Sequence, residues 1–108
     1  MNRWKKRGLA IFPSRIPIHY VFSDYKVYVA VYGHDGTVAV CHSAVEMGQG
    51  ISTKVAQVVA RELRIPLGKV TVKPTDSFTG ANCTFTGTGV TSENMCYVSR
   101  LWYTILNL

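Results

Sequence analysis

The stretch Glu46-Met47-Gly48-Gln49-Gly50-Ile51-Ser52-Thr53-Lys54 places a Gly-x-Gly sequence and two hydroxyl side chains at the start of an amphipathic segment. Five apolar residues follow at positions i, i+4, i+7, i+8 and i+12, namely Ile51, Val55, Val58, Val59 and Leu63. This spacing puts them on one face of a helix with 3.6 residues per turn. The pattern predicts a helix from Gly48 to Leu63, which Ile65-Pro66 ends.

A second stretch, Gly87-Thr88-Gly89-Val90-Thr91-Ser92, has a similar composition and opens a second predicted helix from Val90 to Leu106. The apolar face of that helix consists of Met95, Val98, Trp102, Ile105 and Leu106. The start of a helix exposes backbone N–H groups and carries a partial positive charge, which attracts anionic groups. Glycine also lets a ligand come close to the backbone, because it has no Cβ atom.

Together, the two helix starts predict one site for an anionic or oxygen-rich ligand. Its donors are expected to be backbone N–H groups, the Gln49 amide, and the hydroxyls of Ser52, Thr53, Thr86, Thr88 or Thr91. A simpler interpretation, that the glycines only allow tight strand-to-helix turns, stays open at this point. Neither stretch is a Walker A motif, which needs Gly-Lys-Ser/Thr, or a dinucleotide fingerprint, which needs a third glycine.

The rest of the chain predicts short strands. A hairpin is expected from Lys26–Tyr32 and Thr37–Cys41, because turn-forming residues separate these two β-prone runs. Further strands are expected at Gly8–Phe12 and Lys69–Val72, and a polar loop at Pro74–Phe85. The order β-β-β-α-β-α indicates an α+β fold, in which short strands and a hairpin pack with two amphipathic helices.

The composition fits one small globular domain or part of one, since the chain has 108 residues and 47% apolar content. Its net charge of +6 is concentrated in Arg3-Trp4-Lys5-Lys6-Arg7. We interpret this segment as a solvated domain boundary; the alternative is a small basic nucleic-acid-binding module. The apolar run Gly8–Phe12 is cut short by Pro13, so it predicts no signal peptide, and no stretch predicts a membrane span.

Acidic residues, histidines and cysteines form no catalytic or metal-ligating pattern. We interpret Glu46 as a helix cap in preference to a base, and Asp35 as a turn residue. His42 ends a strand near the predicted site, whereas His19 and His34 share no metal-ligand spacing with it. The 3 cysteines lack a Cys-x-x-Cys pair and favour a reducing compartment with small apolar roles for Cys41, Cys83 and Cys96.

Several of these segments occur in the same order in the xanthine dehydrogenase/aldehyde oxidase family: Asn2–Gly8, Asp35–Val38, Glu46–Gly50, Thr53-Lys54, Gln57 and Ile65-Pro66. The chain resembles that family over essentially its whole length, and Glu-Met-Gly-Gln-Gly is highly specific in this context. The resemblance implies that residues 1–108 are part of a second molybdopterin-binding domain. Lys73-Pro74-Thr75 and Thr86-Gly87 look closer to insect aldehyde oxidases than to xanthine dehydrogenases.

The resemblance implies an oxidoreductase that hydroxylates aldehydes or N-heterocycles with water-derived oxygen. Full-length enzymes of this family carry molybdenum-molybdopterin, FAD and two iron–sulfur clusters, and we expect a cytoplasmic homodimer. The residues implied to lie against the pyranopterin are Met47, Gly48, Gln49 and Gly50. Those implied to lie near its phosphate and the molybdenum are Thr86, Gly87, Thr88, Gly89 and Thr91. We expect no catalytic residue and no metal ligand in this chain, and no activity from it alone.

Three departures from the family pattern matter. His42-Ser43-Ala44 stands where the family often has His-Gly-Gly, Gly89 replaces an expected cofactor-contacting serine, and Thr88 replaces a small residue. The chain also ends at Asn107-Leu108 with no glycine cap, which suggests a fragment of a larger protein. These features support an alternative interpretation, in which the chain is a non-catalytic remnant.

Overall fold

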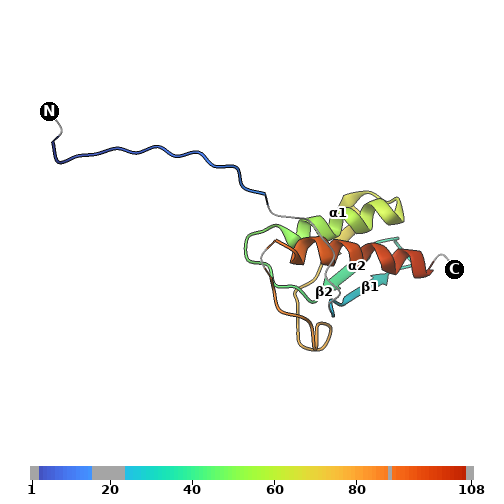
Figure 1. The fold of residues 1–108 in the computed structure, drawn as a ribbon. Helices are drawn as coiled ribbons and strands as arrows, with labels where there is room; N and C mark the ends of the chain where they lie inside the picture. Colours follow the sequence, from blue (N-terminus) through green and yellow to red (C-terminus); the bar gives the residue numbers. More distant parts are fainter. Residues whose placement is uncertain (1–2, 16–23, 88, 107–108) are drawn as a thin grey trace.

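The computed structural model describes residues 3–15, 24–87 and 89–106, with no description of the side chains from 102 onward. Its elements are the strands β1 (Val27–Val31), β2 (Val38–His42) and β3 (Val70–Val72), the helices α1 (Ile51–Leu63) and α2 (Thr91–Leu106), and the 3₁₀ helix η1 (Leu67–Lys69). The sheet order is β1-β2-β3, with β1 antiparallel and β3 parallel to β2. The two helices lie side by side over this sheet (Figure 1). The predicted α+β class is confirmed.

The hairpin of β1 and β2 forms where the sequence predicts it, with Val29 opposite Val40. Asp35 is the turn residue that was expected. One of its carboxylate oxygens accepts hydrogen bonds from the Thr37 amide at 2.9 Å and from the Thr37 hydroxyl at 2.7 Å. The Thr37 amide is the main reason that the pKa of Asp35 lies below its usual value.

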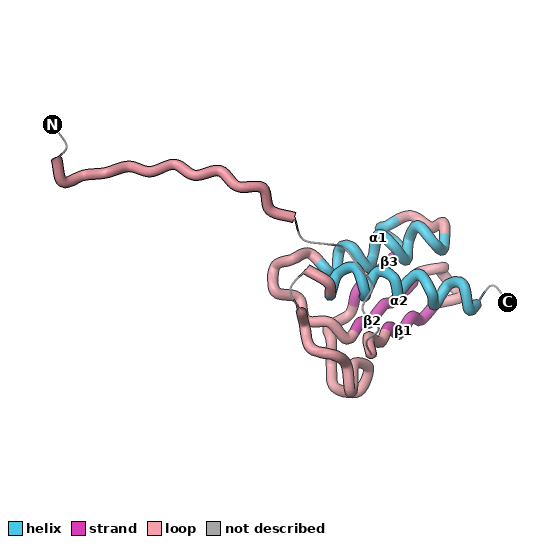
Figure 2. Tube along the Cα trace, in the orientation of Figure 1, coloured by secondary structure: helices cyan, strands magenta, loops and turns pink. Residues whose placement is uncertain are grey.

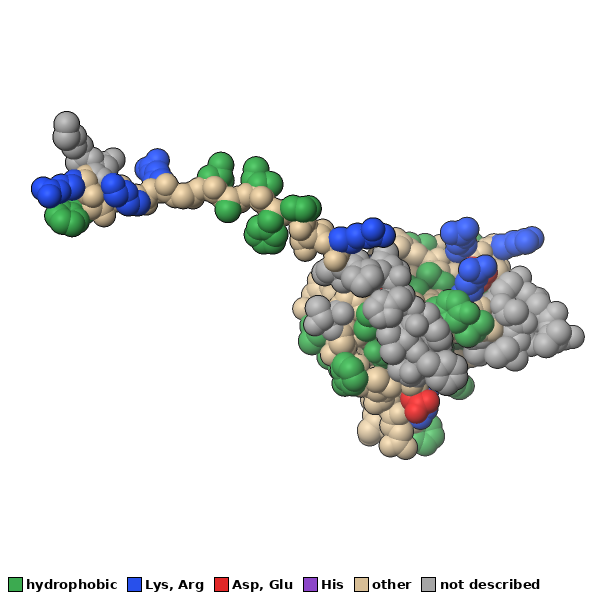
Figure 3. All heavy atoms as spheres, in the orientation of Figure 1, with side chains coloured by type: hydrophobic (Ala, Val, Ile, Leu, Met, Phe, Trp, Pro, Cys, Tyr) green, Lys and Arg blue, Asp and Glu red, His purple; other side chains and the backbone are tan. Residues whose placement is uncertain are grey.

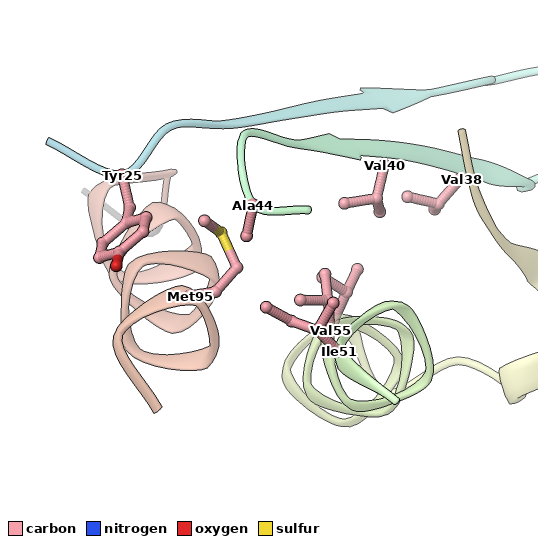
Figure 4. Packing of buried hydrophobic residues seen from close by; sticks show 8 residues of the cluster. Tyr25, Val38, Val40, Ala44, Ile51, Val55 and Met95 are labelled. Atoms are coloured by element: carbon pink, nitrogen blue, oxygen red, sulfur yellow. The ribbon is translucent and has the colours of Figure 1, made fainter. Parts of the chain in front are cut away.

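The core lies between one face of the sheet and the two helices. Alternation along β2 turns Val38 and Val40 toward α1, where they meet Ile51 and Val55, while Met95 enters from α2 (Figure 4). The predicted apolar face of α1 is confirmed: its central residues are buried, and Val58 and Leu63 are half-buried. On α2, Met95 is buried, whereas Trp102, Ile105 and Leu106 lie outside the side chains that the structure describes.

Helix α1 begins at Ile51, three residues later than predicted. Gly48 and Gly50 have φ angles of +92° and +73°, so the segment before Ile51 is a loop with left-handed residues and not a first helical turn. The helix ends at Leu63 and is capped by Arg64, whose left-handed conformation (φ 55°) sends its N–H group back to the Ala60 and Arg61 carbonyls. The chain then enters β3, which lies parallel to β2 and so places α1 in the crossover.

The predicted strand at Gly8–Phe12 is wrong. Residues 3–15, here called the N-terminal arm, run out from the body without forming a described helix or strand (Figures 1 and 2). Leu9, Ile11 and Phe12 are 93%, 91% and 79% exposed. Local β-propensity favours an extended backbone, but a strand also needs a neighbouring strand to bond to. Within the described residues, no helix is long and apolar enough to cross a membrane.

Candidate functional site

A cleft of about 390 Å³ opens between the starts of α1 and α2. Its lining comes from two segments that are distant in sequence: Met47, Gln49, Lys54, Thr86, Gly87, Gly89, Thr91, Ser92 and Glu93. The expectation that the two glycine-containing helix starts meet at one cavity is therefore confirmed. Gly48 and Gly50 shape the loop without lining the cleft, and Thr88 lies outside the described residues.

The loop before α1 closes on the side chain of Glu46. Its Oε1 atom accepts hydrogen bonds from the Gly48 and Gly50 amides, each at 3.0 Å, and its Oε2 atom accepts one from the Ser52 amide at 3.1 Å. These bonds, led by that of the Ser52 amide, hold the pKa of Glu46 below its usual value. The preferred interpretation of Glu46 as a cap is confirmed.

This cap corrects one part of the ligand prediction. The sequence suggested that both helix starts offer free N–H groups, but at α1 an internal carboxylate already accepts the Ser52 amide of the first turn and the Gly48 and Gly50 amides of the preceding loop. The positive end of α1 is therefore largely compensated by Glu46 itself. The electrostatic attraction for an anionic ligand in the cleft therefore comes chiefly from the start of α2 and from Lys54, which also lines the cavity.

Gln49 holds the same loop from within. Its side-chain carbonyl accepts a hydrogen bond from the Met47 amide at 2.5 Å, and its amide donates to the Val45 carbonyl at 2.8 Å. The side-chain amide has a second N–H group besides the one that bonds to Val45, so Gln49 can still donate to a ligand. Met47 is 69% exposed at the cleft and offers it an apolar surface.

The start of α2 is organised by Thr91, which is buried. Its hydroxyl accepts a hydrogen bond from the Gly87 amide at 2.8 Å and donates to the Gly87 carbonyl at 2.9 Å. Tyr25, at the entrance to β1, adds a hydrogen bond from its hydroxyl to the Phe85 carbonyl at 3.1 Å. The hydroxyl of Thr91 thus fixes the turn that carries Gly87 and Gly89, instead of projecting free into the cleft.

The local backbone and packing favour glycine at both Gly87 and Gly89. Gly89 has a φ angle of +76°, which favours glycine. A Cβ atom on Gly87 would lie 3.0 Å from the Phe85 ring, which is tighter than ordinary packing. Gly87 and Gly89 therefore line the cleft with backbone that carries no Cβ atom.

Sequence reasoning missed three polar residues of the cleft: Lys54, Ser92 and Glu93. Lys54 lies in the first turn of α1, since its amide bonds to the Gly50 carbonyl at 3.1 Å, and helical periodicity alone could have placed it beside the glycines. Ser92 is only 9% exposed. The Oε2 atom of Glu93 is buried and accepts no hydrogen bond from the described residues.

His42 does not line the cleft. It is 3% exposed, its Nε2 atom lies 3.3 Å from the Ser52 hydroxyl, and burial lowers its pKa, so the ring is neutral near pH 7. This agrees with the ordinary strand-end histidine that was favoured. His19 lies outside the described residues, and those described contain no group of three potential metal-ligating side chains.

The cysteines differ in their surroundings. Cys41 is buried, with its sulfur 2.9 Å from the Thr79 hydroxyl, and Cys96 is half-buried, which raises the pKa of its thiol. Cys83 is exposed, so its interpretation as an apolar filler is wrong. Its thiol instead donates a hydrogen bond to the Ser43 carbonyl at 3.3 Å.

Comparison with known proteins gives this cleft a family context. The family model described as a molybdopterin cofactor-binding domain matches residues 1–97. The chain belongs to this family. The match covers both cleft-forming segments, and it confirms the resemblance drawn from the motifs around Glu46–Gly50.

Similarity to individual curated proteins supports the same family assignment. The chain is 41% identical over 95 residues to a xanthine dehydrogenase of Oryza sativa subsp. japonica and 40% identical over 95 residues to an aldehyde oxidase of Homo sapiens. A nicotinate hydroxylase of Emericella nidulans is 38% identical over 96 residues. Each alignment covers 85% of this chain, which spans about 7% of the length of the first two relatives. The nearly equal identities do not assign it to either enzyme type.

Proposed function

We propose that this chain supplies part of the binding site for molybdenum-molybdopterin in an oxidoreductase of the molybdenum hydroxylase type. The observation that carries the proposal is the shared cleft, which Met47 and Gln49 from one helix start line together with Thr86, Gly87, Gly89 and Thr91 from the other. A domain family that binds this cofactor and a cavity at the two family-like motifs support the same site.

The polar groups of the cleft fit such a ligand. Molybdopterin carries a phosphate, oxygen atoms and a ring with N–H donors. The start of α2, the Lys54 ammonium and the hydroxyls of Thr86 and Ser92 suit the anionic and oxygen-bearing parts. The buried Oε2 atom of Glu93, which has no hydrogen-bond partner among the described residues, suits an N–H donor.

In this proposal the chain binds and orients, and it holds no reacting group. When bound, the cofactor supplies the redox chemistry by which a substrate carbon loses hydrogen and gains oxygen from water. The loop closed by Glu46 and the turn closed by Thr91 keep the cleft walls in place before the ligand arrives. Preformed walls lower the entropic cost of positioning the cofactor.

The full enzyme is proposed to oxidise aldehydes or N-heterocycles, with FAD and two iron–sulfur clusters bound by segments other than this one, as a cytoplasmic homodimer. The chain alone is proposed to be inactive. The names xanthine dehydrogenase, aldehyde oxidase and nicotinate hydroxylase among its relatives support this class of reaction.

A chimera tests the proposal directly. The 95-residue stretch of human aldehyde oxidase that aligns with this chain is replaced by the present sequence. We expect the chimera to retain molybdenum and to oxidise an aldehyde. Lys54→Met should lower the molybdenum content, because it removes the cation that lines the cleft. Arg61→Met is the matched control, since it removes a cation from the last turn of the same helix.

Metal analysis by mass spectrometry and the rate of aldehyde oxidation are the two measurements. A folded chimera without molybdenum contradicts the proposal. So does a Lys54→Met chimera whose molybdenum content and rate both equal those of the Arg61→Met control.

A further inference from the structure

The two walls of the cleft are held in place in different ways. The wall before α1 is closed by contacts within residues 45–52, made by the side chains of Glu46 and Gln49. The wall before α2 is held partly from a distant part of the chain, because residues 24–26, at the entrance to β1, bond to residues 81–85. The N-terminal arm stands clear of the body (Figure 3), and none of its described residues lines the cleft. The position of the second wall therefore depends on residues 24–26.

Two of these connections are open to solvent. The Asp24 amide donates to the Thr84 hydroxyl oxygen at 2.9 Å, and the Asp24 carbonyl accepts from the Thr84 amide at 3.2 Å. The Lys26 ammonium donates to the Ala81 carbonyl at 2.5 Å. The side-chain bonds of both pairs are exposed, so water can replace either partner when one is removed. The remaining connection, made by Tyr25, is the one that water replaces least easily.

Tyr25 reaches the second wall from the core. It is 7% exposed and belongs to the same buried cluster as Met95 of α2 (Figure 4). Its hydroxyl donates to the Phe85 carbonyl at 3.1 Å and lies 3.5 Å from the Thr91 hydroxyl oxygen. Close packing of the core fixes the ring, so the hydroxyl stays at one place beside the wall.

Both contacts of this hydroxyl lead directly to residues that line the cleft. The Phe85 carbonyl and the Thr86 N–H belong to one planar trans peptide unit, so holding the first fixes the direction of the second. The Thr91 hydroxyl bonds to the amide and the carbonyl of Gly87. Thr86 and Gly87 line the cleft, whereas Tyr25 does not. Tyr25 therefore acts on the wall only through its neighbours.

We propose that Tyr25 is a positioning residue of the cofactor site, and that its hydroxyl keeps Thr86 and Gly87 at the spacing that the bound cofactor needs. This inference rests on the proposed function, since it takes molybdenum-molybdopterin as the ligand of the cleft. Tyr25→Phe leaves the ring in the core and every lining residue unchanged. Its effect is to free the Phe85 carbonyl, so the wall moves more and holds the cofactor for a shorter time.

The first measurement is the rate at which the aldehyde oxidase chimera loses molybdenum during dialysis. Tyr25→Phe should speed this loss roughly fivefold, which is the factor expected for one hydrogen bond. Tyr28→Phe is the matched control, because it removes the same group from β1 at a side chain that is 59% exposed and does not line the cleft. Val38→Ala controls for stability, since it opens a cavity under a residue that is 2% exposed in β2.

The second measurement needs no cofactor. Amide hydrogen exchange of the molybdenum-free chimera is followed by mass spectrometry. Tyr25→Phe should speed exchange at residues 84–87 several-fold and leave residues 46–50 unchanged, because only the second wall depends on Tyr25.

Three results would overturn the role of Tyr25. They are equal exchange at residues 84–87 in Tyr25→Phe and Tyr28→Phe, equal molybdenum loss in those two variants, and a Val38→Ala chimera that loses molybdenum as fast as Tyr25→Phe. A wild-type chimera that never holds molybdenum is a different result, because it contradicts the proposed function itself.

Discussion

The hydroxyl of Thr91 offers the sharpest test of how the cleft wall is built. Thr91→Val keeps the shape and volume of the side chain but removes the oxygen that bonds both to the amide and to the carbonyl of Gly87. An unsatisfied polar group costs about 1–3 kcal/mol when it is buried. Gly87 is half-buried, so water reaches it in part, and we expect a loss of about 1–2 kcal/mol in the free energy of unfolding.

Thermal unfolding of the 108-residue chain, followed by circular dichroism, measures this loss. For a domain of this size it corresponds to a decrease in Tm of roughly 5–10 °C. Thr91→Ser is the matched control, because it keeps the hydroxyl and should retain most of the stability. The reasoning fails if Thr91→Val is as stable as Thr91→Ser, since the two hydrogen bonds would then contribute nothing.

Three further predictions follow from the packing and the loop. Glu46→Gln should destabilise the chain in urea titrations above about pH 4.5 and lose its effect in stronger acid, because the lowered pKa of Glu46 makes its stabilisation disappear as pH falls through that pKa; equal effects at pH 6 and pH 3 contradict this. Met95→Ala should cost about 2–5 kcal/mol of unfolding free energy, since the side chain is fully buried. Gly80→Ala should lower Tm, because its Cβ atom would lie 3.1 Å from the Asp76 carbonyl, whereas Gly68→Ala meets no atom within 4 Å and should leave Tm unchanged.

The hairpin and the two helices could be predicted because their signals are local. Alternation and turn chemistry define β1 and β2, and the 3.6-residue period defines α1. The helix start was misplaced because Gly48 and Gly50 adopt positive φ angles, which a hydrophobic period does not report. The strand predicted at Gly8–Phe12 was wrong for another reason, since β-propensity does not show whether a partner strand is present.

The cleft was predictable in outline but not in its electrostatics. Two helix starts with a similar Gly-x-Gly and hydroxyl composition indicated a common ligand, and they do meet at one cavity. Sequence spacing could not show that Glu46 reaches across the loop to occupy the amides of Gly48, Gly50 and Ser52. It also could not show that Glu93 lines the cleft, or that one of its oxygens is buried without a hydrogen-bond partner among the described residues. Such facts depend on how the loop folds in three dimensions.

The central claim is that the two helix starts hold one cofactor between them. A crystal structure of the aldehyde oxidase chimera with molybdenum-molybdopterin bound tests it most directly. The account predicts cofactor density between residues 47–49 and 86–92, within hydrogen-bonding distance of the Lys54 ammonium or the Ser92 hydroxyl. Cofactor density that touches neither segment, with only water between them, would contradict the account.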